Sequence, residues 1–225
     1  MRDVAIFHRN LRIEDNAALY NASLNNEYFS LFVFDKKYWS QADRSVNQLK
    51  FALDSLSELE AELKKFNVDL YIFEGDLEEL ANYLNKSYPN LNIHMNHTTE
   101  TEYFSKNLKK LSKVNSLNLV NHKDFGIQIS DQNRDIWARD WQVYMKTKTF
   151  DVPLVNKNLN SLDLPTFSKF KADLDQSSVH TQKGGTNSGK ELLTSFLEKR
   201  CKGYSKKMSN PSEAAYACSR LSPHI

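Results

Sequence analysis

The most regular feature of the sequence is a series of short, nearly continuous apolar runs separated by longer amphipathic stretches. Five runs rich in aliphatic, β-branched or aromatic residues have the length of strands: 4–7, 28–34, 70–73, 91–95 and 117–120. A strand that is apolar at almost every position has to be covered on both faces, which is typical of a parallel sheet. The runs therefore predict five buried parallel strands.

The stretches between these runs predict helices. The most regular one carries leucines and a phenylalanine at spacings of three and four: Leu49, Leu53, Leu56, Leu59, Leu63 and Phe66. Asp76 and Glu79 predict a capping box. Asp15 is expected to cap a helix over 17–19, and Thr99 with Glu102 is expected to cap a helix that ends near residue 113. Strictly alternating strands and helices predict an α/β fold with a five-stranded, parallel, doubly wound (Rossmann-like) sheet.

Beyond residue 128 the alternation ends. Trp137, Trp141 and Tyr144 share one helical face, for which packing is a better interpretation than electron transfer. Residues 150–183 contain prolines, Asn and Ser without periodicity, as in a linker, and a helix is expected over 190–202. We therefore expect an α/β domain at 1–128, an interdomain linker at 129–186 and a short α-helical segment at 187–225.

Charge is distributed unevenly along the 225 residues, although the formal net charge is only +2. Residues 1–128 carry 15 Lys and Arg against 18 Asp and Glu, whereas the remainder carries 15 against 10. A basic C-terminal part is compatible with a polyanionic ligand or nucleic acid, although many solvated surfaces look the same. Two cysteines and no apolar run of membrane-spanning length favour a cytoplasmic protein without disulfides or membrane contact, expected to be a monomer.

The C-terminal stretch concentrates the candidate binding chemistry. It contains a tyrosine, a basic pair and a turn with hydroxyls and a guanidinium, and the candidate ligand-binding residues are Tyr204, Cys218, Ser219, Arg220, Leu221 and Ser222. Backbone N–H groups and Ser hydroxyls at a turn into a helix can hold a phosphate or diphosphate. A surface turn in which Ser and Pro only cap helices is the alternative, and this stretch alone favours it.

Both ends of the sequence, however, resemble the DNA photolyase/cryptochrome family. At the C-terminal end the resemblance rests on Gly184-Gly185, Leu192, Phe196-Leu197, Arg200, Tyr204, Ser209, Pro211 and the run from Ala217 to His224. At the N-terminal end it rests on Arg9, Leu11, Arg12, Asp15, Asn16 and Leu19, with Ile6, His8 and Asn10 in place of the usual Trp, Arg and Asp. Two matches in the right order are far less probable by chance than either alone.

The resemblance implies a cofactor, a partner and a reaction. In the family the tyrosine and the turn wrap the diphosphate of FAD, which assigns Tyr204, Ser219, Leu221 and Ser222 to FAD; Cys218 stands where many photolyases have Thr. The first domain of the family also holds an antenna chromophore, a folate or a deazaflavin, for which no residues are assigned here. Arg9 and Arg12 are expected to fix their turn through carboxylates such as Asp15, in preference to binding an antenna.

The resemblance further implies a C-terminally truncated photolyase, because the helical FAD domain of the family continues well beyond Ile225. The full-length parent would bind damaged DNA and split UV-induced pyrimidine dimers by light-driven electron transfer, and no catalytic residue is expected within this chain. Two alternatives stay open: a cryptochrome-type blue-light receptor without repair activity, and a stand-alone α/β nucleotide-binding module.

Other sequence motifs for nucleotide or metal binding are incomplete or absent. The run from Gly184 to Lys190 approximates a P-loop, but Glu191 replaces the Ser or Thr that binds magnesium, and no apolar strand precedes it. No Gly-x-Gly-x-x-Gly follows the first strand, and the six histidines show no metal-ligand spacing. The sequence therefore predicts no metal site.

Overall fold

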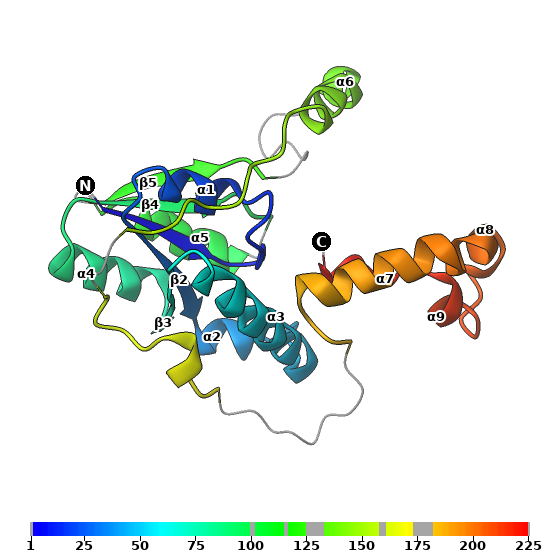
Figure 1. Ribbon diagram of the computed structural model, residues 1–225, viewed down its shortest axis with the longest axis horizontal. Helices are drawn as coiled ribbons and strands as arrows, with labels where there is room; N and C mark the ends of the chain where they lie inside the picture. Colours follow the sequence, from blue (N-terminus) through cyan, green and yellow to red (C-terminus); the bar gives the residue numbers. More distant parts are fainter. Residues whose placement is uncertain are drawn as a thin grey trace.

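The computed structural model describes residues 2–99, 102–114, 117–124, 133–157, 161–172 and 182–224. Its centre is one sheet of five parallel strands in the order β3-β2-β1-β4-β5 (Figure 1). The strands are β1 (Arg2–Phe7), β2 (Tyr28–Phe34), β3 (Leu70–Glu74), β4 (Leu91–Asn96) and β5 (Asn118–His122). The predicted α/β fold and its five parallel strands are confirmed.

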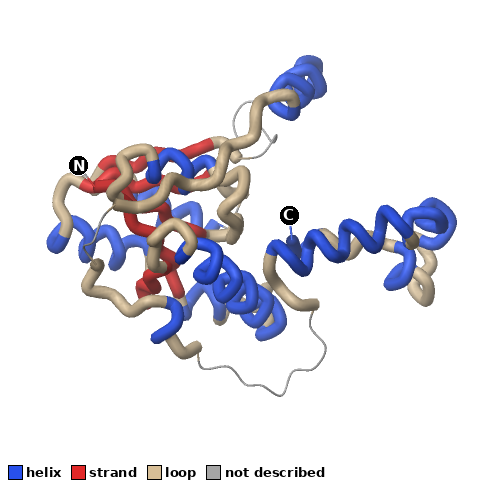
Figure 2. Tube along the Cα trace, viewed as in Figure 1, coloured by secondary structure: helices blue, strands red, loops and turns tan. Residues whose placement is uncertain are grey.

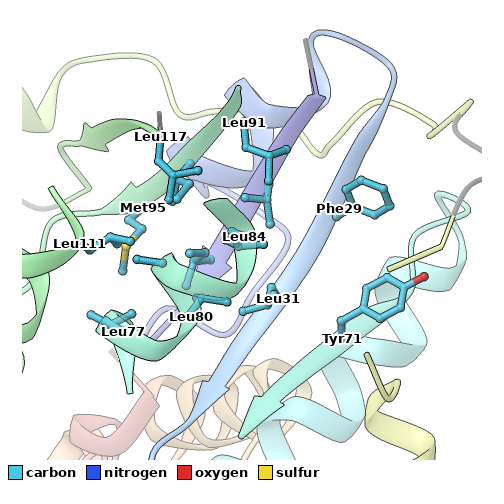
Figure 3. Packing of buried hydrophobic residues seen from close by; sticks show 14 of the residues in the cluster. Phe29, Leu31, Tyr71, Leu77, Leu80, Leu84, Leu91, Met95, Leu111 and Leu117 are labelled. Carbon is cyan, nitrogen blue, oxygen red and sulfur yellow. The ribbon is translucent and has the colours of Figure 1, made fainter. Parts of the chain in front are cut away.

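Helices cover both faces of the sheet, as its apolar strands require. They are α1 (Ala17–Ser23), α3 (Val46–Lys64), α4 (Leu77–Ser87) and α5 (Glu102–Leu111). Because side chains alternate along a strand, Val4 and Ile6 pack with leucines of α4 and α5, while Ala5 and Phe7 pack with leucines of α1 and α3. Figure 3 shows the first of these cores, with Leu77, Leu80 and Leu84 of α4 facing Leu31 and Leu91 of the sheet. The sheet is therefore doubly wound.

Local capping chemistry sets most helix starts. Asp76 Oδ1 accepts from the Glu79 amide and Glu79 Oε2 from the Asp76 amide, both at 2.9 Å, which confirms the predicted capping box. A second box, formed by Ser45 and Gln48, starts α3 at Val46, ahead of the predicted leucine stripe. A short helix not predicted from the sequence, α2 (Lys36–Trp39), follows β2.

The cap of α1 corrects the sequence-based prediction. Asn16, not Asp15, is the N-cap, and its Oδ1 accepts from the Leu19 amide at 3.1 Å. Asp15 instead adopts a left-handed backbone conformation (φ 48°), and its carboxylate accepts from the amide of Phe150 at 3.0 Å. Helix α5 begins at Glu102, and residues 100 and 101 before it lie outside the described residues, so capping by Thr99 stays a prediction.

The segment after α6 (Arg134–Met145) returns to the sheet and follows it closely. The Asn156 side-chain amide bonds both backbone groups of Tyr28, and the Tyr28 hydroxyl donates to the carbonyl of Leu154 at 2.7 Å. Farther along, Leu162 is buried in the first core and the Ile72 amide donates to the carbonyl of Pro165 at 2.9 Å. The described parts of the expected linker thus hold α6 and one short 3-10 helix (Phe167–Lys169), and the part after α6 is hydrogen-bonded to the sheet.

The C-terminal helices project from the sheet domain (Figures 1 and 2). They are α7 (Thr186–Glu198), the 3-10 helix η2 (Arg200–Gly203), α8 (Tyr204–Lys207), α9 (Ala214–Ala217) and η3 (Ser222–His224). Among the described side chains from 186 to 224, only Gly189 and Ala217 are buried. This segment therefore lies outside the core of the sheet, and its surface is open to further packing.

A pair of glycines fixes the start of α7 against α3. The Gly185 amide donates to Ser55 Oγ at 2.9 Å, and a Cβ at Gly184 would lie 2.1 Å from the carbonyl oxygen of Phe51. Gly185 has φ 103°, a conformation that residues with a side chain rarely adopt. The near P-loop sequence therefore serves as a helix start that can approach α3 closely, and α7 begins four residues before the predicted helix.

Candidate functional site

The candidate turn of residues 218–222 links α9 to η3. The Cys218 amide donates to the carbonyl of Ala214 at 2.8 Å, which ends α9. Ser219 Oγ accepts from the Leu221 amide at 3.4 Å, and Arg220 between them has φ 62°. A left-handed residue inside a hydroxyl-stabilised turn brings successive backbone amides together, which is the arrangement that binds anions.

Arg200 of η2 holds this turn against α7. Its guanidinium donates to the carbonyls of Cys218 (2.6 Å) and Ser219 (3.4 Å) on one side. On the other side it donates to the carbonyl of Leu192 (2.7 Å) and to Ser195 Oγ (2.8 Å). Sequence reasoning included Arg200 in the family pattern but gave it no role; its position just after a helix end, where Arg often binds free carbonyls, was the available signal.

Tyr204 lies on a neighbouring helix and is not bonded to the turn in the described structure. It is the first residue of α8, which packs against α9, and its ring meets Phe196 of α7 edge-on at 5.7 Å between centroids. The side chain is 39% exposed, and no hydrogen bond joins it to 218–222 within the described part of the chain. The structure thus brings five of the six candidate residues into one turn and places Tyr204 on the neighbouring helix.

The turn is accessible in part. The side chains of Arg220 and Ser222 are exposed. Such a surface offers hydrogen-bond donors and the positive charge of Arg220 to an anion. No cluster of metal-ligating side chains occurs in the ranges that the structure describes.

His224 anchors the far end of the turn to the sheet domain. Its ring meets Phe51 of α3 edge-on at 4.9 Å and lies 3.2 Å from the position of a Cβ at Gly189. Burial lowers the pKa of His224, opposed by a hydrogen bond to the backbone of Gly185 and by the charge of Glu58. The imidazole thus packs between α3 and α7, and the turn is held at both ends.

The N-terminal turn shows what Arg12 does. Its guanidinium donates to the backbone carbonyls of Glu14 (3.1 Å) and Asp15 (2.9 Å) and lies 3.5 Å from Asp124 Oδ1. The predicted role in fixing the turn is therefore confirmed for Arg12, but its carboxylate partner is Asp124 rather than Asp15. Burial raises the pKa of Asp124, while Arg12 and Asn10 act in the opposite direction.

Aromatic side chains fill the carboxyl end of the sheet beside β1. His8 stacks on Phe104 with 3.9 Å between ring centroids, and the Arg44 guanidinium lies 4.2 Å from the centroid of the Tyr38 ring. Ligands of doubly wound sheets bind at this edge. Because these side chains pack on one another, the structure assigns none of them to an antenna chromophore.

Comparison with known proteins places the chain in a family. The family model described as DNA photolyase matches residues 4–120. A deoxyribodipyrimidine photo-lyase of Buchnera aphidicola is 31% identical over 184 residues, which are 75% of this chain and 36% of that protein. Cryptochrome-1 of Aedes aegypti is 27% identical over 100 residues, 41% of this chain and 18% of that protein.

The fold agrees with these sequence matches. A crystal structure of an archaeal photolyase from Sulfolobus tokodaii, described as holding two FAD molecules, superposes with a TM-score of 0.66 at 21% identity. It covers 100% of this chain and 51% of that one, so the chain spans about half the length of this relative. No helix in the described ranges is long and apolar enough to cross a membrane. The chain belongs to the DNA photolyase/cryptochrome family and corresponds to its N-terminal α/β domain with the segment that follows.

Proposed function

We propose that this chain is the N-terminal part of a blue-light-dependent FAD flavoprotein, a deoxyribodipyrimidine photolyase that repairs UV-induced pyrimidine dimers in DNA. In this proposal residues 1–128 form the antenna-type domain, 129–186 the interdomain linker and 187–225 the start of the FAD-binding helical domain. The observation that carries the proposal is the 218–222 turn, with the exposed Arg220 and Ser222, between short helices of the segment that projects from the sheet.

The turn has the donors that a diphosphate needs. Within the described residues the amides of Ser219 and Arg220 have no acceptor in the chain, and the exposed Ser222 can add a hydroxyl. Tyr204 and Leu221 would flank the ligand, and Cys218 would contribute backbone, since a thiol is a weak donor. These residues would bind and orient FAD through its diphosphate.

FAD, when bound, supplies the light-excited electron donor, and the protein supplies binding, orientation and electrostatics. In this half of the fold, the chain's own contribution is to hold the diphosphate and to set α7 relative to the sheet. The position of α7 is set by the contacts that Gly184, Gly185 and His224 make with α3. The residues that surround the flavin ring and grip the DNA lesion are expected beyond Ile225.

A comparison of two polypeptides tests this proposal. The full gene product should copurify with FAD, seen as a flavin absorption spectrum, and should repair an oligonucleotide with a cyclobutane pyrimidine dimer under blue light but not in the dark. The 225-residue chain alone should do neither, because the diphosphate-binding turn is present without the helices that bury the flavin ring. A stoichiometric flavin spectrum from the chain alone would contradict the proposal that residues outside this chain are needed to retain FAD.

The match to Aedes cryptochrome-1 keeps a light receptor as the second candidate. A full gene product that binds FAD and changes its flavin spectrum under blue light, but leaves the dimer intact, would favour that candidate. A stand-alone nucleotide-binding module would instead make this chain bind ATP or AMP by itself, with heat release measurable by calorimetry.

A further inference from the structure

We propose that Arg200 is the positioning residue of the diphosphate site: it turns the amides of Ser219 and Arg220 toward the ligand and places a positive charge behind them. This inference rests on the proposed binding of FAD through the 218–222 turn and deepens it. The family comparison assigns no role to Arg200, which lies outside the turn and eighteen residues before Cys218.

The trans geometry of the peptides fixes the direction of the two amides. A trans peptide places its C=O and its N–H on opposite sides, and no cis peptide occurs in the described residues. Because the carbonyl of Cys218 is bound to Arg200, the amide of Ser219 points away from Arg200. Because the carbonyl of Ser219 is bound to the same guanidinium, the amide of Arg220 does so as well. One side chain therefore orients two successive N–H groups.

The next peptide is fixed by other groups. The carbonyl of Arg220 accepts from Gln182 Nε2 at 2.7 Å, and the Leu221 amide is bound to Ser219 Oγ. In the described part of the chain the amides of Ser219, Arg220 and Ser222 have no acceptor, and those of Ser219 and Arg220 are adjacent in the turn. Two adjacent amides beside a left-handed residue form a concave donor site that suits one phosphate group.

Arg200 also contributes its positive charge to the site. The acceptors around the guanidinium are carbonyl and hydroxyl oxygens, and no carboxylate lies within ion-pair distance of it among the described residues. A guanidinium is always protonated in proteins, so its positive charge is left for an anion on the other side of the turn. The planar fork can bind several fixed carbonyls at once, which a lysine ammonium on a flexible stem cannot reproduce.

Inorganic pyrophosphate is the probe that tests this role on the 225-residue chain. Titration at constant ionic strength, followed by amide NMR shifts, should move the signals of Ser219 and Arg220. Arg200→Ala should weaken this binding about tenfold or more, and Arg200→Lys about fivefold, because lysine keeps the charge but loses the fork. Lys202→Ala is the matched control: it removes one exposed positive charge close in sequence and should change the affinity by about twofold or less.

The ranking of pyrophosphate affinities among the variants distinguishes a positioning role of Arg200 from a purely structural one. A purely structural role at the end of α7 would lower the melting temperature without this ranking of affinities, so the melting curve and the amide spectrum of the sheet are recorded for each variant. If Arg200→Lys binds like the wild type, or Arg200→Ala like Lys202→Ala, the positioning role is wrong and the proposed FAD site stands. If pyrophosphate moves no signal of the turn in the wild type, both fail.

Discussion

Asn156 provides the sharpest test of how the segment after α6 is integrated into the fold. Its Nδ2 donates to the carbonyl of Tyr28 at 3.0 Å, and its Oδ1 accepts from the Tyr28 amide at 3.3 Å. Pairing of β2 with β3 begins only at Ser30, so the amide side chain takes the place of a neighbouring strand at Tyr28. Tyr28 is fully buried and Asn156 is 8% exposed, so water has little access to these groups.

The magnitude follows from what Asn156→Ala leaves behind. Two hydrogen bonds, each with a net contribution of about 1 kcal/mol, are lost, and a buried N–H and a buried C=O are left without partners. Together we expect the free energy of unfolding to fall by about 2–4 kcal/mol, since an unpaired buried polar group is destabilising by about 1–3 kcal/mol when no water replaces the partner. For a chain of this size that corresponds to a melting temperature lower by about 6–12 °C.

Urea unfolding followed by far-UV circular dichroism measures this change. Lys157→Ala is the control, because its side chain is exposed and its backbone bond to the carbonyl of Asn26 is retained; it should stay within about 0.5 kcal/mol of wild type. Asn156→Asp should be destabilising at neutral pH, where a carboxylate faces the carbonyl of Tyr28, and less so in acid, where its OH can donate. An Asn156→Ala change as small as that of the control would refute the reasoning.

Two further predictions concern the joint of α7 and the edge of the sheet. Gly184→Ala should release α7 from α3, because its Cβ would lie 2.1 Å from the carbonyl oxygen of Phe51. Amide hydrogen exchange in α7 should therefore be faster in this variant. Gly203→Ala is the control: its nearest neighbours are atoms of the flexible Lys207 side chain, so the exchange rates of α7 should be unchanged. Burial, with His94 and His97 nearby, lowers the pKa of His122 to about 4. The unfolded chain therefore binds the proton more readily, so stability is fully present above about pH 6.5 and falls as the pH drops toward 4, by about 1–2 kcal/mol after allowance for partial exposure. Urea unfolding at several pH values checks this, and His122→Asn should flatten the dependence; an unchanged slope would count against it.

Local chemistry was enough to predict the sheet and the start of α4. The apolar runs of the strands demand cover on both faces, and the Asp76–Glu79 capping box involves groups only three residues apart, so both could be found from neighbouring residues. The same local reasoning chose Asp15 over Asn16 as a cap, because either side chain can accept from the first turn. The contact of Asp15 with Phe150, 135 residues away, comes from the fold.

For the candidate site, the sequence by itself determined which residue types are present: hydroxyls, amides and positive charge within a short turn before a proline. Only the tertiary structure decided how they are arranged, because Arg200 meets the carbonyl of Cys218 eighteen residues farther along the chain, and Asn156 meets Tyr28 across 128 residues. Periodicity and capping signals act within a few residues of the chain. Partners at such separations are set by where the chain returns in space, and that return depends on how the sheet, the helices and the glycine joint at α7 pack together.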